Sequence, residues 1–136
     1  MASRVPLGLL DLATGDLTSA HRLLVPGLYH NARYHAQQAG EKALRAFLLH
    51  EMATFPKTHD LSRLIDAIRS FQATFPDVSI ESAVLNECAV DMRYDPQALA
   101  DIDRDEAEAA IGYAQRILDY ARRFLGESIP PQATRP

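Results

Sequence analysis

The chain has 136 residues, of which 14 are lysine or arginine and 18 are aspartate or glutamate, so its formal net charge is −4. This balance argues against a protein that relies on broad phosphate contacts, although it leaves room for a local basic patch, and 47% hydrophobic residues are enough to build the core of one domain. The single cysteine, Cys88, excludes an intramolecular disulfide and a cysteine metal site, and it favours a reducing compartment such as the cytoplasm.

Prolines divide the chain into five predicted helices, because each falls between stretches of helical periodicity and would be costly inside a helix. These prolines are Pro26, Pro56, Pro76 and Pro96. The first two helices are predicted over residues 6–24 and 27–52. The third follows a cap at Thr58 or Asp60 and ends before Phe75, and the last two cover residues 80–92 and 103–125.

The inner faces of the first two helices follow from the spacing of their apolar residues. The first is predicted to bury Leu9, Ala13, Leu17, Ala20 and Leu24. The second carries an alanine stripe that lets another helix approach closely: Ala32, Ala36, Ala39, Ala43 and Ala46. Its polar residues are predicted to lie toward the edges and the opposite face: Gln37, Gln38, Glu41, Lys42 and Arg45.

The last helix opens with Asp103 and Glu106 at capping-box spacing and is predicted to stop at Gly126. Its own alanines mirror the stripe of the second helix, so we expect these two long helices to pack antiparallel. The fold class is therefore all-α, an up-down bundle of four to five helices. Residues 1–126 are predicted to form a single domain, and residues 127–136 a flexible C-terminal tail.

Several short motifs occur in a fixed order along the chain. They are Ala13-x-x-Asp16-Leu17-x-x-Ala20, His35-Ala36-Gln37-Gln38-Ala39-x-Glu41-Lys42-Ala43, Thr58-His59-Asp60-Leu61, Arg93-Tyr94, and Glu106-Ala107 with Ala110 and Ala114. In this order, over about residues 9–125, they resemble the HEPN family of small helical domains. The second and third motifs together are the most specific part of the resemblance.

The resemblance implies a HEPN-like bundle, usually a homodimer, that is associated with nucleotides or RNA. It also implies a minimal nucleotidyltransferase as partner, in a toxin-antitoxin-like or regulatory pair. Family members that act as metal-independent ribonucleases carry an Arg followed four to six residues later by a His. Here Tyr94 follows Arg93, and no His occurs after His59. Because RNA cleavage by this route needs a proton-transferring group such as His, the sequence favours a protein that is not an enzyme.

Arg93 and Tyr94 are the first candidates for nucleotide or RNA binding. A guanidinium beside a bent loop can bind a phosphate, and a tyrosine ring offers a stacking face. The alternative interpretation is structural. Arg93 then pairs with Asp91, Asp95 or a carboxylate of the last helix, and Tyr94 packs beneath it.

Three further binding candidates are Lys42, Gln38 and His59. Lys42 would contact a phosphate and Gln38 a base edge, whereas Glu41 and Arg45 fit an ordinary surface pair four residues apart. His59 follows a predicted N-cap, and we expect it to donate a hydrogen bond to a backbone carbonyl of the second helix. His35 is expected to be a hydrogen-bonded core or interface histidine.

The preferred function is a nucleotide- or RNA-associated interaction module, the helical partner of a minimal nucleotidyltransferase. No cofactor is expected, and no histidine spacing suggests a metal site. No membrane association is expected either, since nowhere do about 18 apolar residues run together. Two alternatives remain open: a ribonuclease of atypical motif that uses Arg93, and a dimerising scaffold without a ligand.

Overall fold

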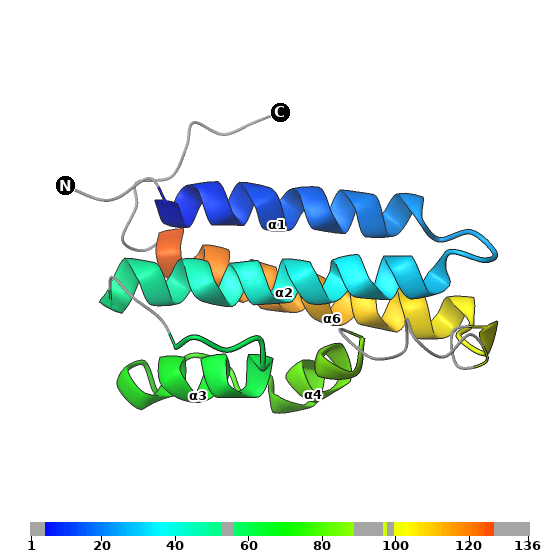
Figure 1. Cartoon of the computed structure of the whole chain (residues 1–136). Helices are drawn as coiled ribbons and strands as arrows, with labels where there is room; N and C mark the ends of the chain where they lie inside the picture. Colours follow the sequence, from blue (N-terminus) through cyan, green and yellow to red (C-terminus); the bar gives the residue numbers. More distant parts are fainter. Residues whose placement is uncertain (1–4, 53–55, 89–96, 98–99, 127–136) are drawn as a thin grey trace.

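A computed structural model of the chain describes residues 5–52, 56–88, 97 and 100–126. Five helices have both ends within these residues, and the described part of the chain contains no strand. The helices are α1 (Val5–Arg22), α2 (Tyr29–Met52), α3 (Leu61–Phe71), α4 (Ser79–Glu87) and α6 (Arg104–Gly126) (Figure 1). The predicted all-α class is confirmed, whereas the predicted tail at 127–136 lies outside the described residues.

The turn between α1 and α2 depends on Gly27. Its φ of 87° lies in the left-handed region, which glycine adopts without steric cost. The N–H of Leu28 closes the turn by donating to the carbonyl of Val25 at 3.0 Å. Helix α2 therefore begins at Tyr29, two residues later than predicted.

The start of α3 is capped as predicted. The side chain of Asp60 accepts a hydrogen bond from the N–H of Ser62 at 2.9 Å. Asn86 of α4 reinforces this cap, because its amide donates to Asp60 at 2.8 Å and its oxygen accepts from the N–H of Leu61 at 2.9 Å. These bonds fix the position of α4 against the beginning of α3.

The predicted capping box of α6 is also present. Asp103 accepts from the N–H of Glu106 at 2.8 Å, and the Glu106 carboxylate accepts from the N–H of Asp103 at 3.4 Å. Arg104 then donates to the carbonyl of Leu24 at 3.1 Å, so the start of α6 is attached to the end of the α1 segment.

Helices α2 and α6 run parallel to each other, and the prediction that they pack antiparallel was wrong (Figure 1). Gly40 faces Ile117, and further along both helices the rings of Phe47 and Phe124 lie 6.0 Å apart between centroids. Alanine stripes show that helices approach closely, but they carry no information on direction. The direction in which α6 runs depends on the segment of chain between the two long helices, which contains α3 and α4.

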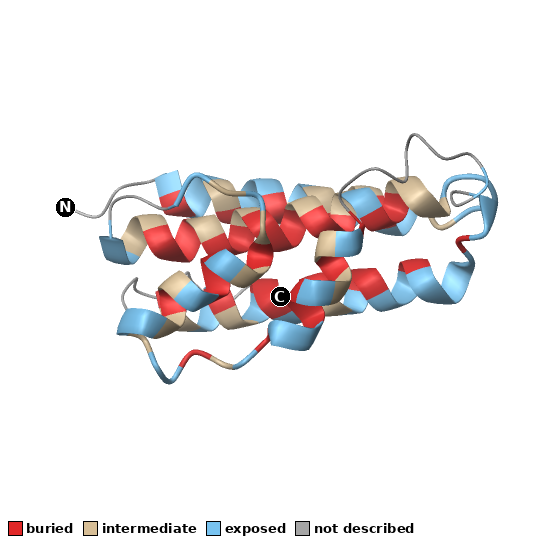
Figure 2. Ribbon diagram, turned by 60° about the horizontal axis from the view of Figure 1, so that its bottom comes forward, coloured by how far each residue is buried: buried red, intermediate tan, exposed pale blue. Residues whose placement is uncertain are grey.

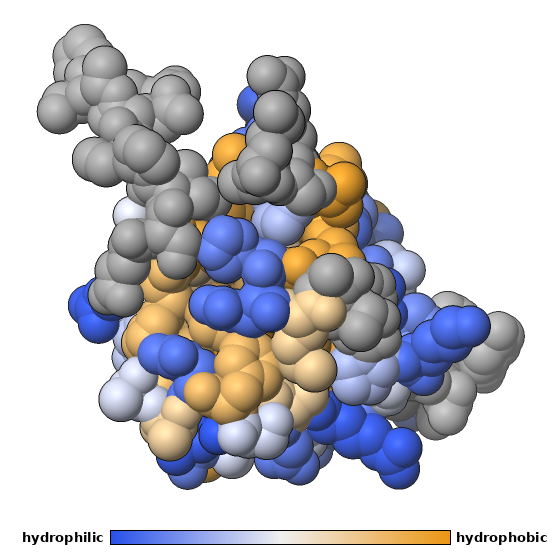
Figure 3. Space-filling model, turned by 90° about the vertical axis from the view of Figure 1, so that its left-hand side faces the viewer, coloured by the Kyte–Doolittle hydropathy of each residue, from blue (hydrophilic) through white to orange (hydrophobic). Residues whose placement is uncertain are grey.

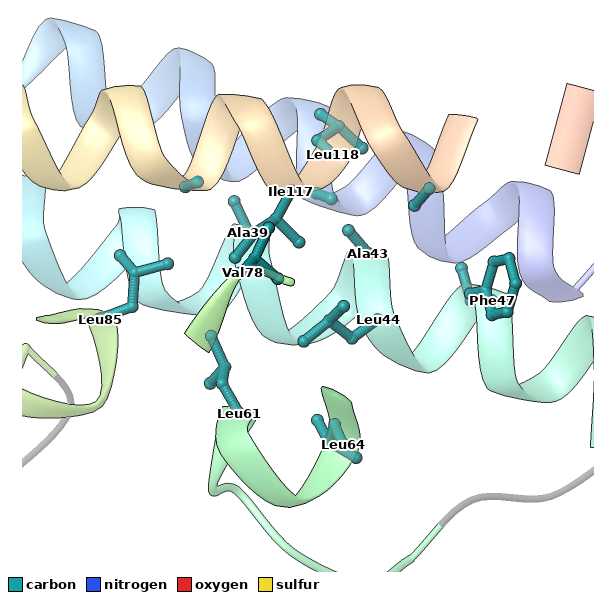
Figure 4. Packing of buried hydrophobic residues seen from close by; sticks show 14 of the residues in the cluster. Ala39, Ala43, Leu44, Phe47, Leu61, Leu64, Val78, Leu85, Ile117 and Leu118 are labelled. Atoms are coloured by element: carbon teal, nitrogen blue, oxygen red, sulfur yellow. The ribbon is translucent and has the colours of Figure 1, made fainter. Parts of the chain in front are cut away.

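The core lies between α2 and the helices around it, and the buried residues, red in Figure 2, face inward. Every alanine of the predicted stripe on α2 is fully buried. Leu61 of α3 and Ile117 of α6 pack against this helix, and Leu64 and Leu118 belong to the same buried cluster (Figure 4). On α1, Leu10 is buried in place of the predicted Leu9.

Gly40 is the point of closest approach in the core. A Cβ atom at this position would lie 3.1 Å from a methyl carbon of Leu85 and 3.2 Å from one of Leu61. It would also lie 3.8 Å from Ile117. Because α3, α4 and α6 all meet α2 here, the missing side chain sets how closely these helices pack.

One end of the bundle is rich in aromatic and apolar side chains. The ring of Phe47 packs against Phe71, Phe75 and Phe124 at centroid distances of 6.1, 5.1 and 6.0 Å. Apolar side chains also gather on the outer surface of this end (Figure 3). Exposed apolar residues here include Val5, Met52 and Phe71. None of the helices in the described ranges combines the length and apolar character needed to cross a membrane.

Candidate functional site

Between its two ends, helix α2 reaches the surface along a narrow strip, since the other helices cover its remaining sides. The strip carries Tyr34, Gln38, Lys42 and Arg45, which recur every three or four residues and are called the α2 ridge below. Tyr34 is 41% exposed. His59, from the segment before α3, lies within 3.4 Å of Arg45 at the edge of the ridge. The ridge therefore combines an aromatic ring with several hydrogen-bond donors.

On the α1 side of the ridge, a carboxylate holds two α2 side chains. Asp16, whose side chain is 13% exposed, accepts from Lys42 Nζ on one oxygen and contacts His35 Nδ1 at 3.0 Å on the other. Lys42 was predicted to contact a phosphate, and here its ammonium is engaged by Asp16. His35 is hydrogen-bonded, as expected.

On the α3 side, Glu41 plays the corresponding role. Its side chain is only 5% exposed, and its Oε2 atom lies 3.1 Å from Arg45 Nη2 and 3.1 Å from His59 Nδ1. Its Oε1 atom accepts from Gln37 Nε2 at 3.1 Å. The interpretation of Glu41 and Arg45 as a surface pair was therefore wrong in one respect, because the carboxylate is buried.

The expectation for His59 also needs correction. Its partner on α2 is the Glu41 carboxylate, and it is Arg45 that donates to a backbone carbonyl, that of Thr58, at 3.0 Å. Since Arg45 has these shorter contacts, its 3.4 Å approach to His59 Nδ1 is secondary. Because an ionised carboxylate can only accept, the contact with Glu41 assigns the hydrogen to His59 Nδ1. The ring is 81% exposed, which leaves Nε2 facing solvent.

Two hydrogen bonds in series also link Gln38 of the ridge to the buried Glu41 carboxylate. Gln38 Nε2 donates to Gln37 Oε1 at 2.7 Å, and Gln37 in turn donates to Glu41. Gln37 is almost fully buried, although its polarity predicted a place at the edge of the helix. The amide of Gln38 is consequently held in one orientation at the surface.

The structure brings three of the five sequence-predicted candidates together: Gln38, Lys42 and His59. Arg93 and Tyr94 lie outside the described residues. Two residues that organise the ridge, Asp16 and Glu41, were not predicted as parts of a site. Both belong to the quoted motifs. Asp16 stands among small and apolar residues in its motif, which was an available signal, whereas the motif of Glu41 is mainly polar and gave none. Within the described part of the chain, no group of three or more histidine, cysteine, aspartate or glutamate side chains could hold a metal ion.

A separate cleft of about 460 Å³ lies near the α1–α2 turn. It is lined by Pro26, Gly27, Tyr29, His30, Ala100 and Ile102. None of the three described candidates, Gln38, Lys42 and His59, lines this cleft, so it is distinct from the ridge.

Cys88 is buried at the end of α4, and its Sγ donates to the carbonyl of Val84 at 3.3 Å. Burial raises the pKa of this thiol, and the nearby Arg33 guanidinium offsets the rise only in part. Because the pKa is raised, a smaller fraction of Cys88 than of a free cysteine is in the thiolate form at pH 8. We therefore expect iodoacetamide to alkylate Cys88 at pH 8 at least about tenfold more slowly than it alkylates glutathione. Equal rates in the native protein would contradict this, and unfolding in guanidinium should restore the normal rate.

These observations define a small all-α domain whose longest helix displays a polar ridge over two nearly buried carboxylates. Residues 8–124 match the HEPN domain. Because this match covers most of the chain, the protein belongs to the HEPN domain family.

Solved structures share the fold. One is an archaeal HEPN homologue, ST0689, with a TM-score of 0.74 and 22% identity over 90% of this chain and 99% of that one. Another is TT1696 from Thermus thermophilus, with a TM-score of 0.74 and 26% identity over 89% of this chain and 98% of that one. Comparison with curated proteins finds no match.

Proposed function

We propose that this HEPN domain is a nucleotide- or RNA-associated interaction module. The α2 ridge is the observation that carries the proposal. An exposed aromatic ring beside oriented amide and guanidinium donors is suited to stacking a base and hydrogen-bonding its edge. Lys42 and Arg45 are each balanced by a carboxylate, so the ridge would bind through stacking and hydrogen bonds more than through net charge. That mode agrees with the net charge of −4.

Replacement of Tyr34 tests the proposal directly. We expect Tyr34→Ala to weaken the binding of a nucleotide or short RNA about tenfold, because stacking on an aromatic side chain contributes roughly 1–3 kcal/mol per base. Isothermal titration calorimetry with AMP, UMP and a 12-nucleotide oligouridine measures the effect. Ile80→Ala is the control, since Ile80 is 73% exposed on α4 and belongs neither to the ridge nor to the aromatic end of the bundle. If both variants bind like the wild type, the ridge is not the binding surface.

The second part of the proposal is a partner, a minimal nucleotidyltransferase. Its support is the family to which the chain belongs. Isolation of the tagged protein from its own host, followed by mass spectrometry of bound protein and nucleotide, tests this part. A small nucleotidyltransferase in stoichiometric amount would support the pairing. Recovery of the protein with neither partner nor nucleotide would favour a ligand-free scaffold.

A homodimer is the proposed oligomeric state. The exposed apolar residues at the aromatic end of the bundle, Val5, Met52 and Phe71, support self-association because contiguous apolar surface favours burial. Light scattering at micromolar concentration would decide the matter. A strictly monomeric species would overturn the proposal.

A ribonuclease of atypical motif is the second candidate function, and Arg93 carries it. The enzyme hypothesis requires cleavage of structured RNA by the wild type and loss of cleavage in Arg93→Ala with the fold retained. Absence of cleavage by the wild-type protein would remove it.

A further inference from the structure

The cleft near the α1–α2 turn is built by two parts of the chain that lie far apart in the sequence. Its described lining residues come from the turn and the start of α2 (Pro26, Gly27, Tyr29 and His30) and from the segment before α6 (Ala100 and Ile102). The guanidinium of Arg104 donates to the carbonyl of Leu24 at 3.1 Å and so joins the two walls. Because this bond and the closed turn hold both walls in place, the cleft is preformed, as small-molecule sites usually are.

Two polar rings that line the cleft have no partner in the fold. Tyr29 and His30 are both half-buried, and within the described part of the chain neither the phenol nor the imidazole makes a hydrogen bond or an ion pair. By contrast, the imidazoles of His35 and His59 each contact a carboxylate. The polar atoms of Tyr29 and His30 are therefore available to a molecule that enters the cleft.

The cleft offers no opposite charge to an ionic ligand. Among the described residues that line it, none is an aspartate, glutamate, lysine or arginine. Asp101 lies between two lining residues in the chain, but it is exposed and accepts a hydrogen bond from Gln97 at 3.3 Å. Because removal of a charge from water is costly when no counter-charge replaces the water, the cleft suits an uncharged ligand.

The shape and polarity of the lining narrow the class of ligand further. Pro26, Tyr29 and His30 all carry rings, which favour a flat apolar body. A phenol can donate and accept a hydrogen bond, and an imidazole carries at least one N–H donor, so the ligand needs both an acceptor and a donor. The volume of about 460 Å³ falls within the range of roughly 300–1,000 Å³ that is typical of ligand pockets.

We propose that this cleft binds a small uncharged organic molecule that has a flat ring system and a carboxamide-like group. The ring packs against the apolar part of the lining. The amide oxygen accepts from the imidazole of His30, and the amide nitrogen donates to the phenol oxygen of Tyr29. The site is separate from the α2 ridge, and the inference does not depend on the function proposed above.

Three small molecules of nearly the same shape test the charge and the place of binding together. Benzamide is neutral, benzoate carries one negative charge, and benzamidinium carries one positive charge. Each is titrated into the ¹⁵N-labelled full chain and followed by amide correlation spectra. We expect benzamide to bind with a Kd on the order of millimolar, as is usual for so few atoms, and to shift the signals of the lining residues. The two charged molecules should bind at least about tenfold more weakly.

Variants locate the site. Ala100→Phe places a ring in the cleft and should weaken benzamide binding at least about tenfold. Ala109→Phe is the matched control, since Ala109 is also exposed but lies on α6 and does not line the cleft. Tyr29→Phe keeps the ring and removes only the hydroxyl, so it should weaken binding about three- to tenfold through the loss of one hydrogen bond. Thermal melting of each variant checks that the fold is retained.

The possible results separate this inference from the proposed function. If none of the three molecules shifts the lining signals at millimolar concentration, the cleft holds only water and the inference is wrong. Equal or tighter binding of benzoate or benzamidinium, or full binding of benzamide to Ala100→Phe, would also overturn it. Tyr34→Ala should bind benzamide like the wild type, because Tyr34 does not line the cleft. Each proposal can therefore fail while the other stands.

Discussion

Leucine in place of Gly40 is expected to lower the free energy of unfolding by about 2–4 kcal/mol. Even a single Cβ atom here would approach methyl carbons of Leu85 and Leu61 to 3.1 and 3.2 Å. A full leucine side chain must therefore displace α3 or α4 from α2. Urea denaturation followed by circular dichroism at 222 nm gives the change.

Gly112→Leu is the matched control for this substitution. Gly112 also lies within a long helix, but a Cβ atom there meets nothing within 4 Å. Leucine is a better helix former than glycine, so the control should gain about 0.5–1 kcal/mol. Equal stability of Gly40→Leu and the wild type would show that α3 and α4 can shift without cost.

Removal of the Glu41 carboxylate should have the second largest effect. In Glu41→Ala, Gln37, Arg45 and His59 lose a shared acceptor, and the amide of Gln37 is left buried. Hydrogen bonds to charged groups contribute roughly 1.5–3 kcal/mol each, but exposed His59 can regain water. We therefore expect a loss of about 2–3 kcal/mol in urea denaturation.

A surface carboxylate provides the comparison. Glu108 pairs with Arg104 at 3.4 Å, and both side chains are about half exposed. Glu108→Ala should cost less than about 0.5 kcal/mol, because exposed ion pairs contribute little. If Glu41→Ala costs no more than this control, the buried network does not stabilise the fold.

The sequence by itself determined the local structure of this protein. The sequence predicted three local features: the alanine stripe of α2, the cap at Asp60, and the capping box of Asp103 and Glu106. Each could be predicted because it depends on residues close together in the chain. The helix period places such residues on one face, and a cap needs only its own first turn. The same local spacing supported the HEPN resemblance, which the match over residues 8–124 confirms.

Only the tertiary structure decided how these elements combine. The periodicity of the apolar residues predicted the buried faces of α2 and α6, but it could not predict that the two helices run parallel. The polarity of Glu41 predicted a place toward the edge or the outer face of its helix, whereas its side chain is only 5% exposed in the fold. The pairing of Asp16 with His35 and Lys42 joins two helices, and no local pattern specifies it. The physical reason is that a carboxylate can be buried only where distant segments supply its donors, and folding alone brings those donors together.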